Sequence, residues 1–292
     1  MNLWQEYLRP TTVAEALQAL KSASGPAIEI AGGTDLLLDL QQGRHSPVHT
    51  LVDLNSIAEM AALELRDDEL FIGASVPVNR IVLDPLAGVH AEALIEAARL
   101  IGGPQVRNTA TLGGNVAHAL PAADGTIALT ALNTQAEIAS LSGTRRVPFT
   151  SLYLGPGKSA LKKGEELVVG FYLLQIKKGQ ASCFKRIMRP QGVALPIINT
   201  AIWLERENDT IREIRIAVGP AGPTPFRAIK TEDSLRGQKY GDFAINQALE
   251  VLLAEAKFRT SPQRASAEYR QHLVVVLFRD TLRTAWERAR KA

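Results

Sequence analysis

The first half of the chain mixes helical and strand spacing of its apolar positions. Residues 13–20 place their apolar side chains on one helical face, and Thr12 with Glu15 has the spacing of an N-terminal capping box. A short strand is expected at residues 28–31, and a second helix starts at Leu36. A glycine-rich turn is therefore expected between the end of a strand and the start of a helix.

Further along, the pattern predicts one long helix and several strands. The helix covers residues 89–100 and ends before Pro104, which follows two glycines, a sequence that stops helices. The polar, glycine-bearing segment 105–124 is expected to be irregular. Strand patterns occur at residues 50–54, 62–65, 70–73, 136–141, 146–149 and 167–173, of which the second and third form a predicted hairpin.

The second half has a different pattern, and the charged run 177–180 is the best candidate for a domain boundary. An antiparallel sheet is expected from strands at residues 182–187, 197–204 and 211–218, followed by helices at 242–256 and 265–290. The last helix has two apolar stripes, Tyr269-Leu273-Val276 and Val275-Phe278-Leu282-Trp286. A helix that is apolar on two sides is expected to be buried on two sides, against its own sheet and against the first domain or another subunit.

Composition and charge exclude several classes of protein. The 292 residues suggest about two domains, and 46% apolar with 22% charged residues is typical of globular proteins. A net charge of +3 without a basic stripe does not indicate a nucleic-acid partner. The apolar runs are too short for a membrane span, and the first residues do not resemble a secretion signal, so a cytoplasmic location is expected.

The residues that usually carry metal or nucleophilic chemistry are scarce. Cys183 is the only cysteine, so the chain cannot hold its own iron–sulfur cluster, thiolate zinc site or internal disulfide. The five histidines lack metal-ligand spacing, and no nucleophile elbow is present. No metal ligand and no catalytic residue is predicted.

Two glycine-rich segments are the candidate chemistry of the chain. Residues 31–35 read Ala-Gly-Gly-Thr-Asp, and residues 111–115 read Thr-Leu-Gly-Gly-Asn. Adjacent glycines let the backbone turn tightly and present N–H groups to an anion, so the pair could bind the two phosphates of a dinucleotide. Two tight structural turns are the alternative. Neither segment has the Rossmann or P-loop spacing.

These segments, with Pro121 and Asp124, resemble the FAD-binding medium subunit of the xanthine dehydrogenase family of molybdenum hydroxylases, which includes carbon monoxide dehydrogenase flavoproteins. The resemblance covers nearly the whole chain, and bacterial xanthine dehydrogenase FAD subunits are the most similar members. It implies an α+β fold. An FAD-binding domain of the vanillyl-alcohol-oxidase type would span residues 1–177, with subdomains at about 1–55 and 56–177. A smaller C-terminal domain of antiparallel sheet and helices would span 180–292.

The resemblance also implies where FAD binds. The pyrophosphate would contact both glycine-rich segments, Leu167 would lie at the adenine end, and Lys185 would reach the cofactor from the C-terminal domain. His118 is included because it follows the second segment closely. The full implied set is Ile28, Glu29, Ile30, Ala31, Gly32, Gly33, Thr34, Asp35, Thr111, Leu112, Gly113, Gly114, Asn115, His118, Asp124, Leu167 and Lys185.

The function implied by the resemblance is electron transfer within a larger complex. FAD, held non-covalently, would receive electrons from [2Fe–2S] clusters of one partner subunit, and a molybdopterin subunit would carry the organic substrate. The electron acceptor would be NAD or another molecule. The choice stays open, because residues 189–194 lack the acidic side chain that NAD-using relatives often carry. Two alternatives stay open: a stand-alone FAD-dependent oxidoreductase, and a nucleotide-binding regulatory module.

Overall fold

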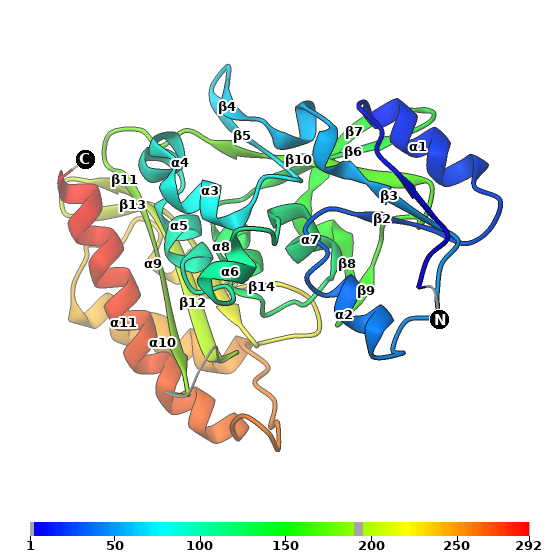
Figure 1. Cartoon of the computed structure of the whole chain (residues 1–292). Helices are drawn as coiled ribbons and strands as arrows, with labels where there is room; N and C mark the ends of the chain where they lie inside the picture. Colours follow the sequence, from blue (N-terminus) through cyan, green and yellow to red (C-terminus); the bar gives the residue numbers. More distant parts are fainter. Residues whose placement is uncertain (1–2, 190–194, 292) are drawn as a thin grey trace.

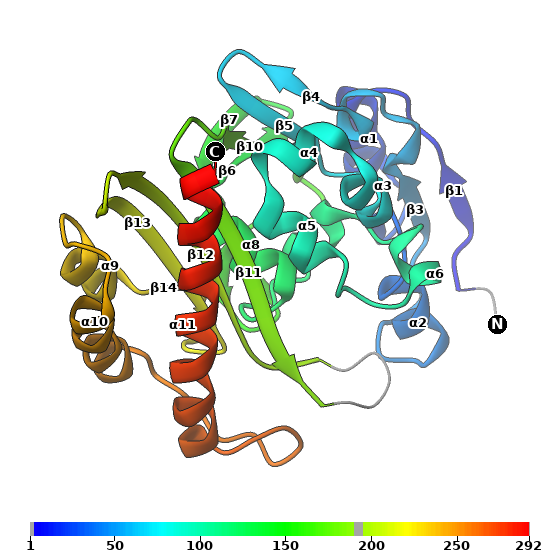
Figure 2. The ribbon, with the colours of Figure 1, turned by 90° about the vertical axis from the view of Figure 1, so that its left-hand side faces the viewer.

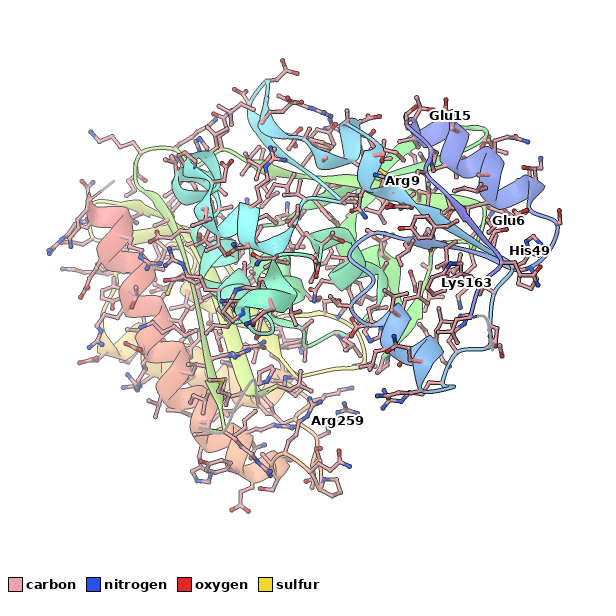
Figure 3. The ribbon with its side chains drawn as sticks, in the orientation of Figure 1. Glu6, Arg9, Glu15, His49, Lys163 and Arg259 are labelled. Atoms are coloured by element: carbon pink, nitrogen blue, oxygen red, sulfur yellow. The ribbon has the colours of Figure 1, made fainter. Side chains whose placement is uncertain are left out.

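A computed structural model describes residues 3–189 and 195–291 of the chain, so predictions that involve residues 190–194 lie outside the described residues. The N-terminal region forms a three-stranded parallel sheet in the order β1-β3-β2. Its elements are β1 (Glu6–Leu8), α1 (Val13–Ser22), β2 (Ala27–Ile30), α2 (Leu36–Gln41) and β3 (Thr50–Asp53). The predicted capping box at α1 is confirmed, because Thr12 accepts from the Glu15 N–H and Glu15 (labelled in Figure 3) accepts from the Thr12 N–H.

A five-stranded antiparallel sheet follows, in the order β4-β5-β10-β6-β7. Its strands are β4 (Leu63–Arg66), β5 (Glu69–Gly73), β6 (Gln135–Ser140), β7 (Gly143–Pro148) and β10 (Glu166–Leu174), and the small hairpin β8 (Tyr153–Gly155) with β9 (Lys158–Ser159) lies between β7 and β10 in the chain. The predicted hairpin β4–β5 is confirmed. All residues of the central strand β10 except Leu174 are buried, which fits the apolar run that follows Glu166.

Six helices connect β5 to β6, and here two predictions are wrong. They are α3 (Val78–Leu83), α4 (Pro85–His90), α5 (Glu92–Ala98), α6 (Pro104–Arg107), α7 (Leu112–Ala117) and α8 (Asp124–Ala131). The single helix expected at residues 89–100 is divided at Ala91, whose φ of −137° leaves the helical region. The segment 105–124 contains helices α6 and α7 rather than irregular chain.

The C-terminal region contains the predicted antiparallel sheet, which confirms the expected α+β fold class. Its order is β11-β12-β13-β14. Its elements are β11 (Gln180–Met188), β12 (Pro196–Glu207), β13 (Thr210–Gly219), β14 (Phe226–Arg227), α9 (Ile229–Leu235), α10 (Asp242–Glu255) and α11 (Ala267–Lys291). Figure 1 shows this part beside the two N-terminal sheets.

The C-terminal sheet lies between helices of both halves of the chain. Helix α11 crosses one face, and α5 and α8 pack on the other, as Figure 2 shows. Because side chains alternate along a strand, Phe184 and Trp203 join the core of the N-terminal half, whereas Cys183 and Ile202 join the core beneath α11. The two halves therefore share one hydrophobic layer.

One of the two apolar stripes of α11 is buried, and the other is only partly covered, through Leu273. Phe278, Leu282 and Trp286 are buried against the sheet and its neighbouring elements. In the other stripe Tyr269 is 50% exposed and Val276 65% exposed. Among the described residues, no helix has the length and apolar character that a membrane crossing requires.

Candidate functional site

A cavity of about 140 Å³ lies where the two glycine-rich segments meet the end of β9 and the start of β10. Five of the predicted residues line it, and the N-terminal sheet, α7 and β10 each contribute to its wall. The five are Glu29, Ala31, Gly113, Gly114 and Leu167. Segments that are distant in sequence therefore meet at one site.

The first segment forms an open loop between β2 and α2. Asn55 Nδ2 donates to the carbonyl oxygen of Ala31 at 2.9 Å, which fixes the start of the loop. Gly33 has a φ of +64°, a conformation that favours glycine. Within the described residues, the N–H groups of Gly33, Thr34 and Asp35 donate to no backbone carbonyl. Because α2 has only six residues, these amides, rather than a helix dipole, are the groups that can bind phosphate.

The second segment differs from the first, because it is the first turn of α7 and its amides have partners within the chain. Thr111 is the N-cap and accepts from the Gly114 N–H at 3.1 Å. The Gly113 N–H donates to the Ala74 carbonyl at 2.9 Å. A Cβ on Gly113 would lie 2.6 Å from the Ala74 Cβ, so glycine is needed for α7 to pack against the end of β5. The glycines of this segment therefore allow α7 to pack closely, and the segment does not supply free N–H groups.

The first segment directly contacts the chain just before the second segment. A Cβ on Gly32 would lie 2.1 Å from the carbonyl oxygen of Thr109, a separation that no side chain tolerates. At Gly114 the only atom close to such a Cβ is Thr111 Oγ1 at 3.2 Å, and Gly114 lines the cavity. Gly32 thus lets the loops approach, and Gly114 leaves room beside them.

Other predicted residues pack away from the cavity. Ile28 and Ile30 belong to a small core with Leu51 on the opposite face of the parallel sheet. Leu112 is buried in the main core. His118 is exposed at the C-terminus of α7 and is not among the residues that line the cavity.

Asp124 lies in a buried polar cluster between the two halves of the chain. Its carboxylate accepts from Arg186 of β11, and Asn199 Nδ2 of β12 donates to it at 2.8 Å. Burial raises the pKa of Asp124, whereas Arg186 and Asn199 lower it. Asn199 Oδ1, Arg186 Nε and the nearby Asn115 Oδ1 are buried without a hydrogen-bond partner among the described residues. These three atoms could therefore each form a further hydrogen bond.

Lys185 is not brought to this cluster. It neighbours Arg186 in β11, so its side chain points to the opposite face of the sheet. There Lys185 Nζ lies 2.6 Å from Asp280 Oδ2 of α11. The carboxylate of Asp124 is thus paired with the arginine that follows the predicted lysine.

Sequence reasoning missed several residues at these positions. Asn199 could have been found, because a single amide within an apolar strand usually has a buried partner. The remaining cavity residues carry no motif that could have identified them. They are Leu54, Met60, Ala74, Ser75, Ala117, Leu161, Glu166 and Val168.

The residues of the site fit parts of FAD, and the cavity of about 140 Å³ accommodates one portion of the cofactor. Free amides of the first loop suit a pyrophosphate, the apolar wall around Leu167 suits an aromatic base, and Gly114 leaves space that a Cβ would reduce. The unpartnered atoms beside Asp124 are additional polar groups next to α7. Among the described residues, no three His, Cys, Asp or Glu side chains come together as a metal site.

Comparisons with known proteins agree with this fit. Residues 3–173 match the model of the FAD binding domain in molybdopterin dehydrogenase, and residues 182–285 match the CO dehydrogenase flavoprotein C-terminal domain. The chain is similar to the xanthine dehydrogenase FAD-binding subunit of Escherichia coli O157:H7, with 32% identity over 96% of this chain and 95% of the relative.

Carbon monoxide dehydrogenase of Hydrogenophaga pseudoflava is similar in both sequence and structure. Its medium chain is 27% identical over 97% of both chains. A solved structure of that enzyme, lacking the Mo-pyranopterin moiety of the molybdenum cofactor, matches with a TM-score of 0.90, 27% identity, and coverage of 97% of this chain and 98% of the other. The chain therefore belongs to the FAD-binding subunits of the molybdenum hydroxylase family, a family of oxidoreductases.

Proposed function

We propose that this chain is the electron-transfer subunit of a cytoplasmic molybdenum-containing hydroxylase, related to xanthine dehydrogenase. It takes electrons from [2Fe–2S] clusters of a partner subunit and passes them from FAD to NAD or another acceptor. The observation that carries the proposal is the cavity between the two glycine-rich segments, within a chain whose family binds FAD. Bound FAD supplies the conversion between one-electron and two-electron transfer.

The residues of this chain bind and orient the cofactor. The amides of residues 33–35 bind the pyrophosphate, and Leu167 with its apolar neighbours holds the adenine end. Neither glycine-rich segment contains His or Cys, the residues that usually form covalent flavin bonds, so FAD is held non-covalently. The buried cluster of Asp124 and Arg186 stabilises the approach of the C-terminal sheet to α7 and α8.

The exposed stripe of α11 supports the need for a partner. Tyr269 and Val276 present apolar side chains on a helix whose opposite side is fully packed. An iron–sulfur subunit must bring a cluster close to the flavin, and a molybdopterin subunit must supply the electrons. With Cys183 as the only cysteine, the chain cannot supply such a cluster itself.

The absorption spectrum of the purified chain tests cofactor binding, and co-expression with the neighbouring genes tests the complex. We expect the two visible bands of oxidised flavin, release of intact FAD on denaturation, and recovery of iron- and molybdenum-bearing partners in a pull-down. The isolated chain should show weak diaphorase activity at most. Oxidation of an organic substrate by the single chain would contradict the proposal and favour a stand-alone oxidoreductase.

A further inference from the structure

The first glycine-rich segment begins where the three strands of the parallel sheet end. In such a sheet the carboxyl ends of the strands lie at one edge, so the residues that follow β1, β2 and β3 come together there. Asp53, the last residue of β3, is buried among them, at 5% exposure. Asn55 follows in the short helical turn Leu54–Ser56 and is exposed. These two side chains connect the sheet to the loop that carries the free amides.

Asp53 holds the side-chain amide of Asn55 in one orientation. Asp53 Oδ1 accepts from the Asn55 backbone N–H at 2.9 Å and from Asn55 Nδ2 at 2.7 Å. Because an ionised carboxylate only accepts hydrogen bonds, the amide turns its NH₂ group, rather than its oxygen, toward Asp53. The other oxygen, Oδ2, accepts from the Tyr7 hydroxyl at 2.9 Å and lies 3.6 Å from Nε of Arg9, which Figure 3 labels. Residues at the end of β1 therefore hold Asp53, and Asp53 holds Asn55.

The same NH₂ group of Asn55 also reaches the loop. Asn55 Nδ2 donates to the Ala31 carbonyl oxygen at 2.9 Å, which sets the orientation of the peptide group between Ala31 and Gly32. Gly32 is held as well, because it packs on the Thr109 carbonyl with no room for a side chain. The loop is thus fixed at two adjacent residues. Immediately after them come residues 33–35, whose N–H groups donate to no backbone carbonyl within the described residues.

We propose that Asp53 and Asn55 are positioning residues of the FAD site, which hold the amides of residues 33–35 in the arrangement that binds the pyrophosphate. Asp53 acts through Asn55, and Asn55 acts through the Ala31 carbonyl, so neither side chain has to touch the cofactor. A loop that already has its bound conformation loses less conformational entropy when the ligand binds, and therefore binds it more tightly. This inference rests on the proposed binding of FAD at this loop, and it names the groups that prepare the loop for it.

The test is a double-mutant cycle that measures the dissociation constant of FAD for the full-length apoprotein. Asn55→Leu removes the donor to the Ala31 carbonyl, and we expect FAD to bind about 5- to 10-fold more weakly. Asp53→Leu should cause a loss of similar size, because it releases the Asn55 amide. Since both changes interrupt one chain of hydrogen bonds, the double variant should lose no more than Asn55→Leu does. Two independent structural defects would instead multiply their effects on the dissociation constant.

Conservative and distant variants are the controls. Asp53→Asn keeps an oxygen that can accept from Asn55, so its FAD binding should stay within about twofold of wild type. Asn246→Leu, at an exposed position of α10 where the side chain accepts from Arg279, is the matched control and should bind FAD as wild type does. Because Asn55 is exposed, the apoprotein of Asn55→Leu should melt close to the wild-type temperature.

Several results would overturn the inference while leaving the proposed function in place. They are unchanged FAD binding in Asn55→Leu, a multiplied loss in the double variant, and a loss in Asp53→Asn equal to that in Asp53→Leu. A clearly lower melting temperature of the Asn55→Leu apoprotein would also overturn it, because a general structural role would then explain the weaker binding. A folded wild-type protein that binds no FAD would instead contradict the proposed function, and this inference with it.

Discussion

Arg288 in the last turns of α11 lies 2.6 Å from Glu96 of α5, and the two side chains together cover the edge strand of the C-terminal sheet. Arg288 donates to the carbonyl oxygen of Ser182 at 2.8 Å, and Glu96 accepts from the N–H of Phe184 at 2.7 Å. Both backbone groups belong to β11, whose outer edge pairs with no strand in the described part of the chain. The ion pair therefore joins three elements and blocks further strand pairing at this point.

Replacing Arg288 should weaken the contact between the two halves. Arg288→Ala removes a charged hydrogen bond to Glu96 and one to β11, so we expect the free energy of unfolding to fall by about 1–3 kcal/mol. Urea denaturation measures this change. Arg290→Ala, at an exposed position one residue further on from Ala289, is the control and should have little effect. A change of equal size in both variants would contradict the specific role of Arg288.

Gly114→Val should reduce FAD content without unfolding the protein. The new side chain would lie beside the cavity, where only Thr111 Oγ1 is close. Helix α7 can therefore accommodate the valine, but the valine would occupy space that the cofactor needs. We expect flavin content after purification to fall at least ~10-fold, while the circular dichroism spectrum is unchanged. Gly33→Val is a poorer test, because its φ of +64° strains any other residue. Gly88→Val, at an exposed position of α4, is the control. Full flavin retention in Gly114→Val would refute the assignment of residues 111–115 to the FAD site.

Arg186→Met should destabilise the protein strongly at neutral pH. It leaves the buried carboxylate of Asp124 without its positive partner, and such a loss is typically worth about 3–5 kcal/mol. Burial already raises the pKa of Asp124, so the variant should regain stability relative to wild type as the pH falls and the carboxylate is protonated. Thermal denaturation between pH 5 and pH 8 measures this trend. A pH-independent difference would contradict it.

His90 should make stability depend on pH in the opposite direction. Burial lowers the pKa of His90 below its ordinary value of 6.5, and the Ile176 N–H donates to His90 Nδ1 at 3.2 Å. The unfolded chain therefore binds the proton more readily, and stability should fall as the pH drops below about 6.5. His90→Gln can keep the hydrogen bond but not the titration, so it should be less sensitive to acid. His45→Gln, at a partly exposed position, is the control substitution.

Val276→Glu should separate folding from assembly. Val276 is 65% exposed, so a charge there should leave the stability of the isolated chain within about 0.5 kcal/mol of wild type. In a pull-down with co-expressed partners, recovery of the complex should fall. Lys291→Glu at the end of the same helix is the control for charge. Undiminished recovery for Val276→Glu would assign the partner surface elsewhere.

The sequence predicted those parts of the fold in which apolar periodicity and local caps agree. The capping box of α1 and the helix α10 are examples, because each helix has one apolar face and one polar face. The antiparallel sheet was recognised from apolar strands separated by turn residues. Helix α8 was missed because all eight of its residues are buried, so it has no polar face and no period. The break at Ala91 depends on how α4 and α5 pack, which no local pattern records.

The candidate site was predictable to a similar depth. The glycine pairs could be recognised as motifs, and Leu167 was implied by the family resemblance. Of these residues, Gly113, Gly114 and Leu167 line the cavity. The partner of Asp124 could not be identified in this way, because Lys185 and Arg186 are adjacent cations on a strand. Which of them faces the N-terminal half depends on the register and twist of the whole sheet.

The shared hydrophobic layer makes the peptide link between the halves dispensable once the chain is folded. Phe184 and Trp203 are part of the core of the other half, and the exposed Lys177 and Lys178 lie in the connection between β10 and β11. A protease that cut this connection would release no fragment, since the cut pieces would stay together as a non-covalent heterodimer. Expressed without the first half, residues 180–292 would present a bare sheet face and an open strand edge, and would aggregate.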